Sequence, residues 1–380
     1  MRKMKFTILI TVIAMFFTRG TTVYAQELPG SKDGFGIEMN AIDGKVIKHS
    51  PKFLLPIPER SSAYDINFVW QTCGRKVWQQ RRRFPLVGIG FTYTNYGIDS
   101  IYGRVFGVYP NLQVPIIKGE KLEWTFRIGF GIGYATRHYS RAPQWDTLNN
   151  AIGSNLNNFT MFMTDIRYHV NKHWDIQLGG NFSHMSNATL HIPNLGINMY
   201  GAHIGVRYFP VNSQPKCYVT EQKPLENRWL LQARGGIAFT QTGAAYGPLY
   251  KVFLGSLYAS RRYRGKNKYF GGIDYSYHQD IYAFEKNNEI NPGTERQHAW
   301  KSAIFLGDEF MVGRVGILTQ MGVYIKEAVL VQDPYYEKLG ANFYIIQREH
   351  GPLKELFTGV LLKTHKFVAE LAEIEVGFGF

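Results

Sequence analysis

The sequence predicts an all-β protein, a transmembrane antiparallel β-barrel of about 16 strands. From Leu122 to Tyr134 every even position is apolar, and the odd positions carry Glu123, Thr125, Arg127 and glycines. Segments with this period of two recur along the chain, with turn residues between them. Alternation of this kind is typical of a barrel wall that has lipid on one face and polar groups on the other. A soluble sandwich rarely sets large aromatics and glycines on opposite faces in this way.

Sixteen strands are expected in all. Fifteen alternating segments lie near 63–72, 85–95, 101–114, 121–135, 157–170, 173–186, 197–209, 228–241, 249–260, 268–278, 297–307, 311–326, 337–347, 354–364 and 367–380. A barrel with both termini on one side needs an even number of strands, so we place one more between Phe35 and Ile57. The strands divide into halves at 26–209 and 228–380, joined by a linker at 210–227. Because this linker is short, we favour one wide barrel over two tandem eight-stranded barrels.

The N-terminus has the pattern of a secretory signal peptide at residues 1–25. Basic residues precede an apolar run from Phe6 to Phe17, and Val23-Tyr24-Ala25 fits a cleavage site. The run is shorter than the roughly 20 residues of a membrane helix. The chain ends at Phe380 after another alternating segment, which resembles the C-terminal assembly signal of outer-membrane barrels. We therefore expect the protein in the cell outer membrane.

The net charge indicates an anionic lipid partner. The charge of the whole chain is +14, and removal of the four cations in residues 1–25 leaves +10. An exported basic protein is not expected to meet nucleic acid, whereas outer-membrane lipids and the phosphates of lipopolysaccharide are anionic. Arg137 and Arg141, in an expected outer loop, are the candidates for phosphate binding. The plainer explanation of the surplus of lysine and arginine is that these residues keep the loops solvated.

Cysteine and histidine spacing predicts neither a metal site nor a cofactor. The sequence has no CxxC and no HExxH pattern. Cys73 and Cys217 both fall in turns expected on the periplasmic side, where the compartment permits a disulfide between them. Sequence alone leaves this pairing open.

The stretch from His184 to Asn198 carries the candidate chemistry. Trp174, Ile176, Leu178 and Phe182 form the apolar face of one strand, and His184 and Ser186 continue that face. An imidazole beside a serine hydroxyl can take its proton and make the oxygen a nucleophile. Asn198 has the same lipid-facing parity on the next strand. Polar groups that face hydrocarbon are costly unless their substrate lies there, although strand ends near the interface also tolerate them.

This stretch resembles the active-site segment of the outer-membrane lipid A 3-O-deacylases, the PagL-type family, at His184, Ser186, Asn187, Pro193-Asn194 and Gly196. Residues 149–158 and 361–380 resemble longer, roughly double-size relatives. The resemblance implies a serine nucleophile, a histidine base and a third residue twelve positions after the serine. That position is Asn198, where the family has glutamate, and Thr189 stands where the family has glycine.

The implied function is removal of an ester-linked acyl chain from lipid A. Ser186 would attack the ester carbonyl, His184 would act as base and then acid, and Asn187 would hold the oxyanion. Asn198 would orient His184 but adds no charge, so we expect an active, slower esterase. The alternative is a non-catalytic barrel, a channel or structural protein with a degenerate site.

Strand direction predicts where the site lies in the membrane. With the C-terminus in the periplasm, strand 173–186 runs outward and Ser186 reaches the outer leaflet. Segments 136–156, 279–296 and 327–336 are then outside, and the basic runs 81–83 and 261–268 are periplasmic turns. The charged residues expected to face the lumen are Arg104, Arg127, Arg207, Arg234, Glu373 and Glu375.

Overall fold

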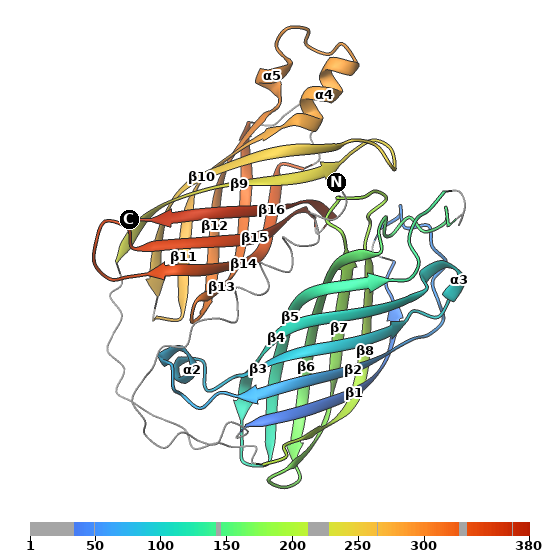
Figure 1. Cartoon of the computed structure of the whole chain (residues 1–380), viewed down its shortest axis with the longest axis vertical. Helices are drawn as coiled ribbons and strands as arrows, with labels where there is room; N and C mark the ends of the chain where they lie inside the picture. The colour runs from blue at the N-terminus through green and yellow to red at the C-terminus, as the bar shows by residue number, and fades with distance from the viewer. Residues whose placement is uncertain are drawn as a thin grey trace, which may run out of the picture. The chain divides into compact units, whose positions relative to one another are not determined.

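The chain folds into two closed antiparallel barrels of eight strands each. The computed structural model describes residues 34–48, 50–141, 146–211, 228–263, 265–326, 333–366 and 368–380. Figure 1 shows the first barrel in blue to green and the second in yellow to red. The expected all-β fold and the tandem-barrel alternative are confirmed, and the single wide barrel that we favoured is wrong. The predicted signal peptide and residues 212–227 of the predicted linker lie outside the described residues.

The first barrel closes because its last strand pairs with its first. β8 pairs antiparallel with β1, and Ile37 lies opposite Tyr208. The strand that we placed between Phe35 and Ile57 is β1. The elements of this barrel are β1 (Phe35–Val46), β2 (Ser61–Gln71), α2 (Val77–Arg81), β3 (Leu86–Asn95), α3 (Asp99–Tyr102), β4 (Arg104–Lys118), β5 (Leu122–Ala135), β6 (Leu156–His169), β7 (Trp174–Ser186) and β8 (Ile197–Tyr208).

The second barrel closes in the same way, by pairing of β16 with β9, where Ile374 lies opposite Ile237. Its elements are β9 (Trp229–Gln241), β10 (Leu249–Tyr263), β11 (Asn267–His278), α4 (Gln279–Asn287), α5 (Glu295–His298), β12 (Trp300–Val312), β13 (Val315–Lys326), β14 (Tyr335–Gln347), β15 (Glu355–His365) and β16 (Val368–Gly379). Among the described residues, no helix has the length and apolar character needed to cross a membrane.

The period of two in the sequence separates an apolar outer wall from a polar interior. Leu178, Ile204 and Leu231 are 62%, 61% and 64% exposed on the outside of the strands. Their neighbours of opposite parity, such as Gln177 and His203, are buried inside. A wall with this exposure is stable only where the surrounding medium is itself apolar.

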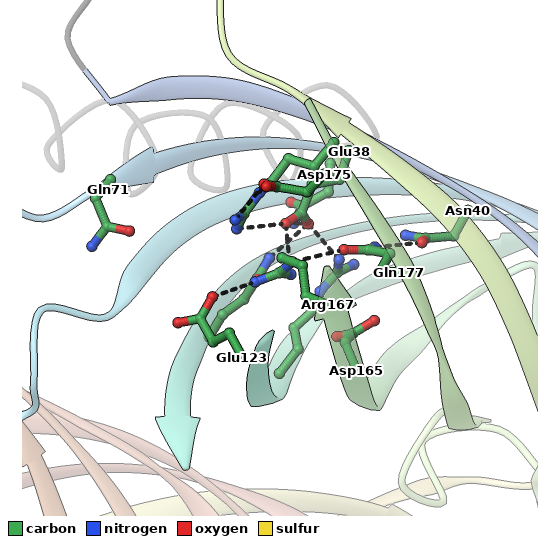
Figure 2. A network of polar contacts seen from close by, with 12 residues as sticks. Glu38, Asn40, Gln71, Glu123, Asp165, Arg167, Asp175 and Gln177 are labelled. Atoms are coloured by element: carbon green, nitrogen blue, oxygen red, sulfur yellow. Dashed lines mark hydrogen bonds and ion pairs between the residues drawn. The ribbon is translucent and has the colours of Figure 1, made fainter. Parts of the chain in front are cut away.

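The interior of the first barrel is filled by charged residues that pair with one another. Arg127 lies 2.7 Å from Asp65 and also contacts Glu38. Figure 2 shows the guanidinium of Arg167 directed at Glu38, Gln177 and Glu123. Buried charges are tolerated when each has partners of opposite sign. A narrow barrel packed in this way has a solid core at this level and not an aqueous pore.

The second barrel has its own buried charge network. Lys338 Nζ lies 3.0 Å from Asp274 and 2.9 Å from Glu373. Arg234 contacts Glu375 at 3.4 Å. These pairs agree with the lumen positions predicted for Arg127, Arg207, Arg234, Glu373 and Glu375, all of which are buried.

Two charged residues depart from their predicted places. Arg104 has outward parity and pairs with Asp99 of α3 at 2.5 Å, so it is not a lumen residue. Lys268, which we assigned to a solvated turn, is 1% exposed and lies inside the second barrel, 2.7 Å from Glu355. In both cases the first residues after a turn do not reveal which face they take, because the turn resets the parity.

Long connections gather at one end of the first barrel. These are 47–60, 96–103, 136–155 and 187–196, and the opposite end carries the short turns 119–121 and 170–173 as well as 72–85, which holds α2. Asn150 ties two of the long connections together, because its side chain bonds the backbone of Lys52 and Leu54. Phe53, Ile152 and Met185 are fully buried in the apolar cluster at this end. The loop end of the barrel is therefore a packed cap.

Candidate active site

The candidate residues lie on the outer face of the wall where β7 meets its two neighbours at the loop end. His184 of β7 is the cross-strand partner of Asn198 on β8. On the other side, Thr160 of β6 lies opposite His184, and Asn158 lies opposite Ser186. The side chains of directly opposed residues on one face of a sheet are close enough to interact. The period of two thus brings residues from three strands to one patch of the wall.

His184 links Asn198 and Ser186 into one hydrogen-bonded chain. Its Nδ1 lies 2.6 Å from Asn198 Oδ1, and its Nε2 lies 2.9 Å from Ser186 Oγ. The amide oxygen accepts only, so Nδ1 carries the proton and Nε2 is left to accept from the serine hydroxyl. This is the arrangement in which an imidazole can withdraw a proton from a nucleophile while a third group fixes its tautomer.

Gly196 makes room for the imidazole. Its φ is +79°, and a Cβ built there would lie 2.8 Å from His184 Cε1 and 3.5 Å from Ser186 Cβ. Contacts under 3.0 Å are not tolerated, and a positive φ also disfavours side chains other than hydrogen. Glycine is therefore required here for two reasons. Sequence reasoning noted Gly196 only as part of a resemblance and gave no sign of this contact.

Asn187 organises the turn that connects β7 and β8. Its backbone N–H donates to Asn194 Oδ1 at 2.9 Å, and its side-chain amide donates to the carbonyl of His191 at 2.9 Å and to Ser154 Oγ at 3.1 Å. Asn187 is 5% exposed. These bonds hold the turn beside Ser186. The oxyanion role of Asn187 stays a prediction, and it requires one of these donors to turn towards the substrate.

Thr189 adopts a backbone conformation that suits glycine. Its φ is 61°, and Ala188 before it has φ of 52°. Residues with a Cβ are strained in this left-handed region, by about 1 kcal/mol or more. Position 189 is the one where the resembling family carries glycine. The substitution thus leaves the turn geometry in place at some cost in backbone strain.

The segment 149–158 packs against this turn. The N–H of Gly196 donates to the carbonyl of Ala151 at 2.8 Å, and a Cβ on Gly153 would lie 2.7 Å from the carbonyl oxygen of His191. Asn149 is fully buried, and its amide donates to the carbonyl of Ile101. The connections at the loop end of the barrel therefore hold the strand ends that carry the dyad.

The accessibility of the three residues differs. Ser186 is 2% exposed, whereas His184 and Asn198 are half-buried. Thr160, which sequence reasoning missed, is 7% exposed and donates to Asn158 Oδ1 at 3.0 Å. Cross-strand parity on β6 is the signal that would have found Thr160 and Asn158. Attack on an ester therefore requires Ser186 Oγ to become uncovered when the substrate binds.

The remaining predicted residues lie outside this patch. Arg137 and Arg141 are exposed on the 136–155 connection, and Arg141 bonds the hydroxyl of Tyr139 at 3.4 Å. Within the described ranges, no contact joins either arginine to Ser186. Cys217 lies outside the described residues, so its pairing with Cys73 stays a prediction. In the part of the chain that the structure describes, no cluster of three His, Cys, Asp or Glu side chains could hold a metal ion.

Comparison with known proteins identifies both halves of the chain. Residues 62–207 match the family model of lipid A 3-O-deacylase (PagL), and residues 227–380 match that of the C-terminal domain of acyloxyacyl hydrolase. None of the curated proteins that were compared matches the chain significantly.

Solved barrels resemble parts of the structure. The outer membrane enzyme PagL is 16% identical, with 44% of this chain and 97% of that chain covered and a TM-score of 0.30. Neisserial surface protein A is 9% identical over 46% of this chain and 97% of its own, with a TM-score of 0.33. These scores are below 0.5, so the assignment rests on the two family models. Because they match its first and second barrels in turn, the chain belongs to the PagL family of lipid A 3-O-deacylases, as a double-length member with an acyloxyacyl hydrolase C-terminal domain.

Proposed function

We propose that the first barrel is an outer-membrane esterase that removes the ester-linked acyl chain at the 3-position of lipid A. The observation that carries this proposal is the chain Asn198–His184–Ser186 on the outer face of an apolar wall. A hydrogen-bonded serine and imidazole on that face can meet only a substrate that lies in the bilayer. An ester near the outer interface, with its acyl chain in hydrocarbon, fits this position.

The reaction would proceed in two acyl transfers. His184 Nε2 takes the Ser186 proton as Oγ attacks the ester carbonyl. As the bond to the sugar breaks, the same proton passes to the departing 3-oxygen, which leaves as a hydroxyl. Water, activated by His184, attacks the acyl-serine and releases the fatty acid with Ser186 regenerated. Asn198 keeps the imidazole in the tautomer that both steps need.

Donors for the oxyanion would come from the turn after Ser186. Asn187 is our candidate, through its side chain or its backbone N–H. Arg137 and Arg141 would bind the phosphates of lipid A from the outer connection, because guanidinium groups pair well with phosphate oxygens. The buried, paired charges inside both barrels argue against the alternative of a channel.

The decisive experiment compares lipid A from cells that express variants of the protein. Ser186→Ala and His184→Ala should each abolish loss of the 3-linked acyl chain, as seen by mass spectrometry. Ser183→Ala is the matched control, because Ser183 lies on the same strand but faces the interior, 4% exposed. Heat-modifiable migration on gels reports whether each barrel is folded. Normal trimming by folded Ser186→Ala would refute the proposed mechanism.

A further inference from the structure

A second candidate site lies in the second barrel, at the end where β9 begins. A cavity of about 240 Å³ opens there, opposite the end that carries α4 and α5. Its lining includes Arg228, Arg262 and Arg348 together with Ser260 and two glutamates. None of these residues belongs to the first barrel, and the esterase mechanism uses none of them.

Ser260 is a buried hydroxyl that lacks a partner. It is 1% exposed and faces inward on β10, and its Oγ makes no hydrogen bond to any residue that the structure describes. Such groups are rare in native proteins, and each calls for a ligand, water or functional explanation. The hydroxyl lines the cavity, so a bound acceptor there would satisfy it.

The acidic group in the cavity is already neutralised by cations. Glu355 accepts from Arg262 at 2.9 Å through one oxygen. Its other oxygen accepts from Lys268 at 2.7 Å and from Gln232 at 2.6 Å. With both carboxylate oxygens engaged, Glu355 offers a ligand no uncompensated negative charge.

Arginines at the rim of the cavity add further positive charge. Arg228 donates to the backbone carbonyls of Arg348 and Glu349, which fixes its guanidinium at the mouth of the cavity. The Arg348 side chain is exposed at the same rim, and Glu349 is the one rim carboxylate among the lining residues. Cations therefore outnumber carboxylates around a hydroxyl donor.

We propose that this cavity binds a phosphate group on a small ligand. Guanidinium and hydroxyl donors that surround one space suit the several acceptor oxygens of phosphate. The cavity of about 240 Å³ has room for a phosphate group with a small substituent. The phosphate belongs either to a soluble phosphate ester or to a lipid headgroup.

The test is isothermal titration of the full-length protein, in phosphatidylcholine nanodiscs, with inorganic phosphate. Wild type should bind saturably, and Ser260→Ala and Arg348→Ala should each bind about ten-fold more weakly, as expected for loss of a hydrogen bond to a charged group. Arg314→Ala is the matched control, because Arg314 is an exposed arginine at the same end of the barrel that does not line the cavity. It should bind like wild type.

The same variants guard against misfolding as an explanation. Ser260→Ala removes a buried hydroxyl without a partner among the described residues, so it should unfold at the same temperature as wild type or higher. Absence of saturable binding to wild type would overturn the site, and so would unchanged affinity in folded Ser260→Ala. Lipid A trimming by Ser260→Ala should equal that of wild type, which separates this proposal from the esterase.

Nanodisc composition distinguishes the two sources of phosphate. If a lipid headgroup is the ligand, phosphatidylglycerol should weaken phosphate binding by a larger factor in wild type than in Ser260→Ala. If the ligand is soluble, repulsion by the anionic surface should weaken binding by the same factor in both proteins at equal ionic strength. Either result supports a phosphate site and names its source.

Discussion

Gly196 and His184 approach so closely that no side chain fits between them. A Cβ on Gly196 would lie 2.8 Å from Cε1 of the imidazole. The same ring bonds Asn198 through Nδ1 and Ser186 through Nε2. The backbone of the β7–β8 turn therefore limits the orientation of the His184 ring on the side of Cε1. The two hydrogen bonds fix the ring through its nitrogens.

Gly196→Ala should lower kcat for deacylation by about 100-fold, because displacement of a catalytic group by roughly 1 Å can cost that much. KM should change little, since Gly196 lies against the base His184 and has no part in binding the substrate in the proposed reaction. Steady-state kinetics on purified lipid A in detergent gives both constants.

Gly243→Ala controls for backbone strain. Gly243 has φ of +84°, close to that of Gly196, but a Cβ there would meet nothing within 4 Å. It should cost some stability and leave kcat unchanged. Equal losses of kcat in both variants would show that strain, and not the contact with His184, is responsible.

Asn198→Ala should lower kcat about ten-fold or more without unfolding the barrel, because the imidazole loses the acceptor that sets its tautomer. Asn198→Glu should keep or raise activity, since a charge-assisted hydrogen bond is roughly twice as strong as a neutral one. The measurement is release of fatty acid from lipid A.

Asn158→Ala is the matched control for Asn198. It removes an amide from the same outer face, opposite Ser186, but Asn158 does not bond the imidazole. It should retain activity within about two-fold. Full activity in Asn198→Ala would leave a Ser186–His184 dyad with its orienting group elsewhere.

Alternation in the sequence predicted the strands and the parity of the dyad, because a period of two translates directly into the face that a residue takes. Ile176 and Leu178 identified the outer face of β7, and the equal parity of His184 and Ser186 placed these two residues on the same face. The closure of the barrels was beyond this reasoning. β8 pairs with β1 and not with β9. Because β1 and β9 have the same alternating pattern, the pattern does not show which of them is the partner of β8.

Contacts that depend on the course of the turns were also beyond the sequence. The approach of Gly196 to His184 requires a positive φ and a turn folded back on β7. The bond of Asn187 to Ser154 joins two connections whose relative path no local pattern encodes. Lys268 and Arg104 were misplaced for the same reason, since each follows a turn.

Arg127→Ala should destabilise the first barrel by about 3–5 kcal/mol, because it leaves Glu38 and Asp65 as buried carboxylates short of a partner. Arg104→Ala removes an ion pair that is partly exposed, with Asp99, and should cost less than about 1 kcal/mol. Urea unfolding in lipid vesicles, followed by tryptophan fluorescence, measures both. Similar losses of unfolding free energy in the two variants would mean that water reaches the charged residues inside the first barrel.

Cysteine labelling tests the direction of β7 in the membrane. Leu148 is the better reporter of the outer connection, because it is 63% exposed whereas Asn149 beside it is buried. Glu120 reports the opposite end and is preferable to Gly119, where a Cβ would lie 2.8 Å from the carbonyl oxygen of Leu122. Both substitutions are made in a background with Cys73→Ser and Cys217→Ser, so that native thiols do not react.

On intact cells an impermeant maleimide should label Leu148→Cys and not Glu120→Cys, because strand 174–186 is proposed to run outward and the two positions lie at opposite ends of the first barrel. Permeabilised cells should label both, which shows that Glu120→Cys is reactive once the reagent reaches it. The reverse pattern on intact cells would place Ser186 at the inner leaflet. Lipopolysaccharide resides in the outer leaflet, so that result would remove it as the substrate even if the Asn198–His184–Ser186 chain is catalytic.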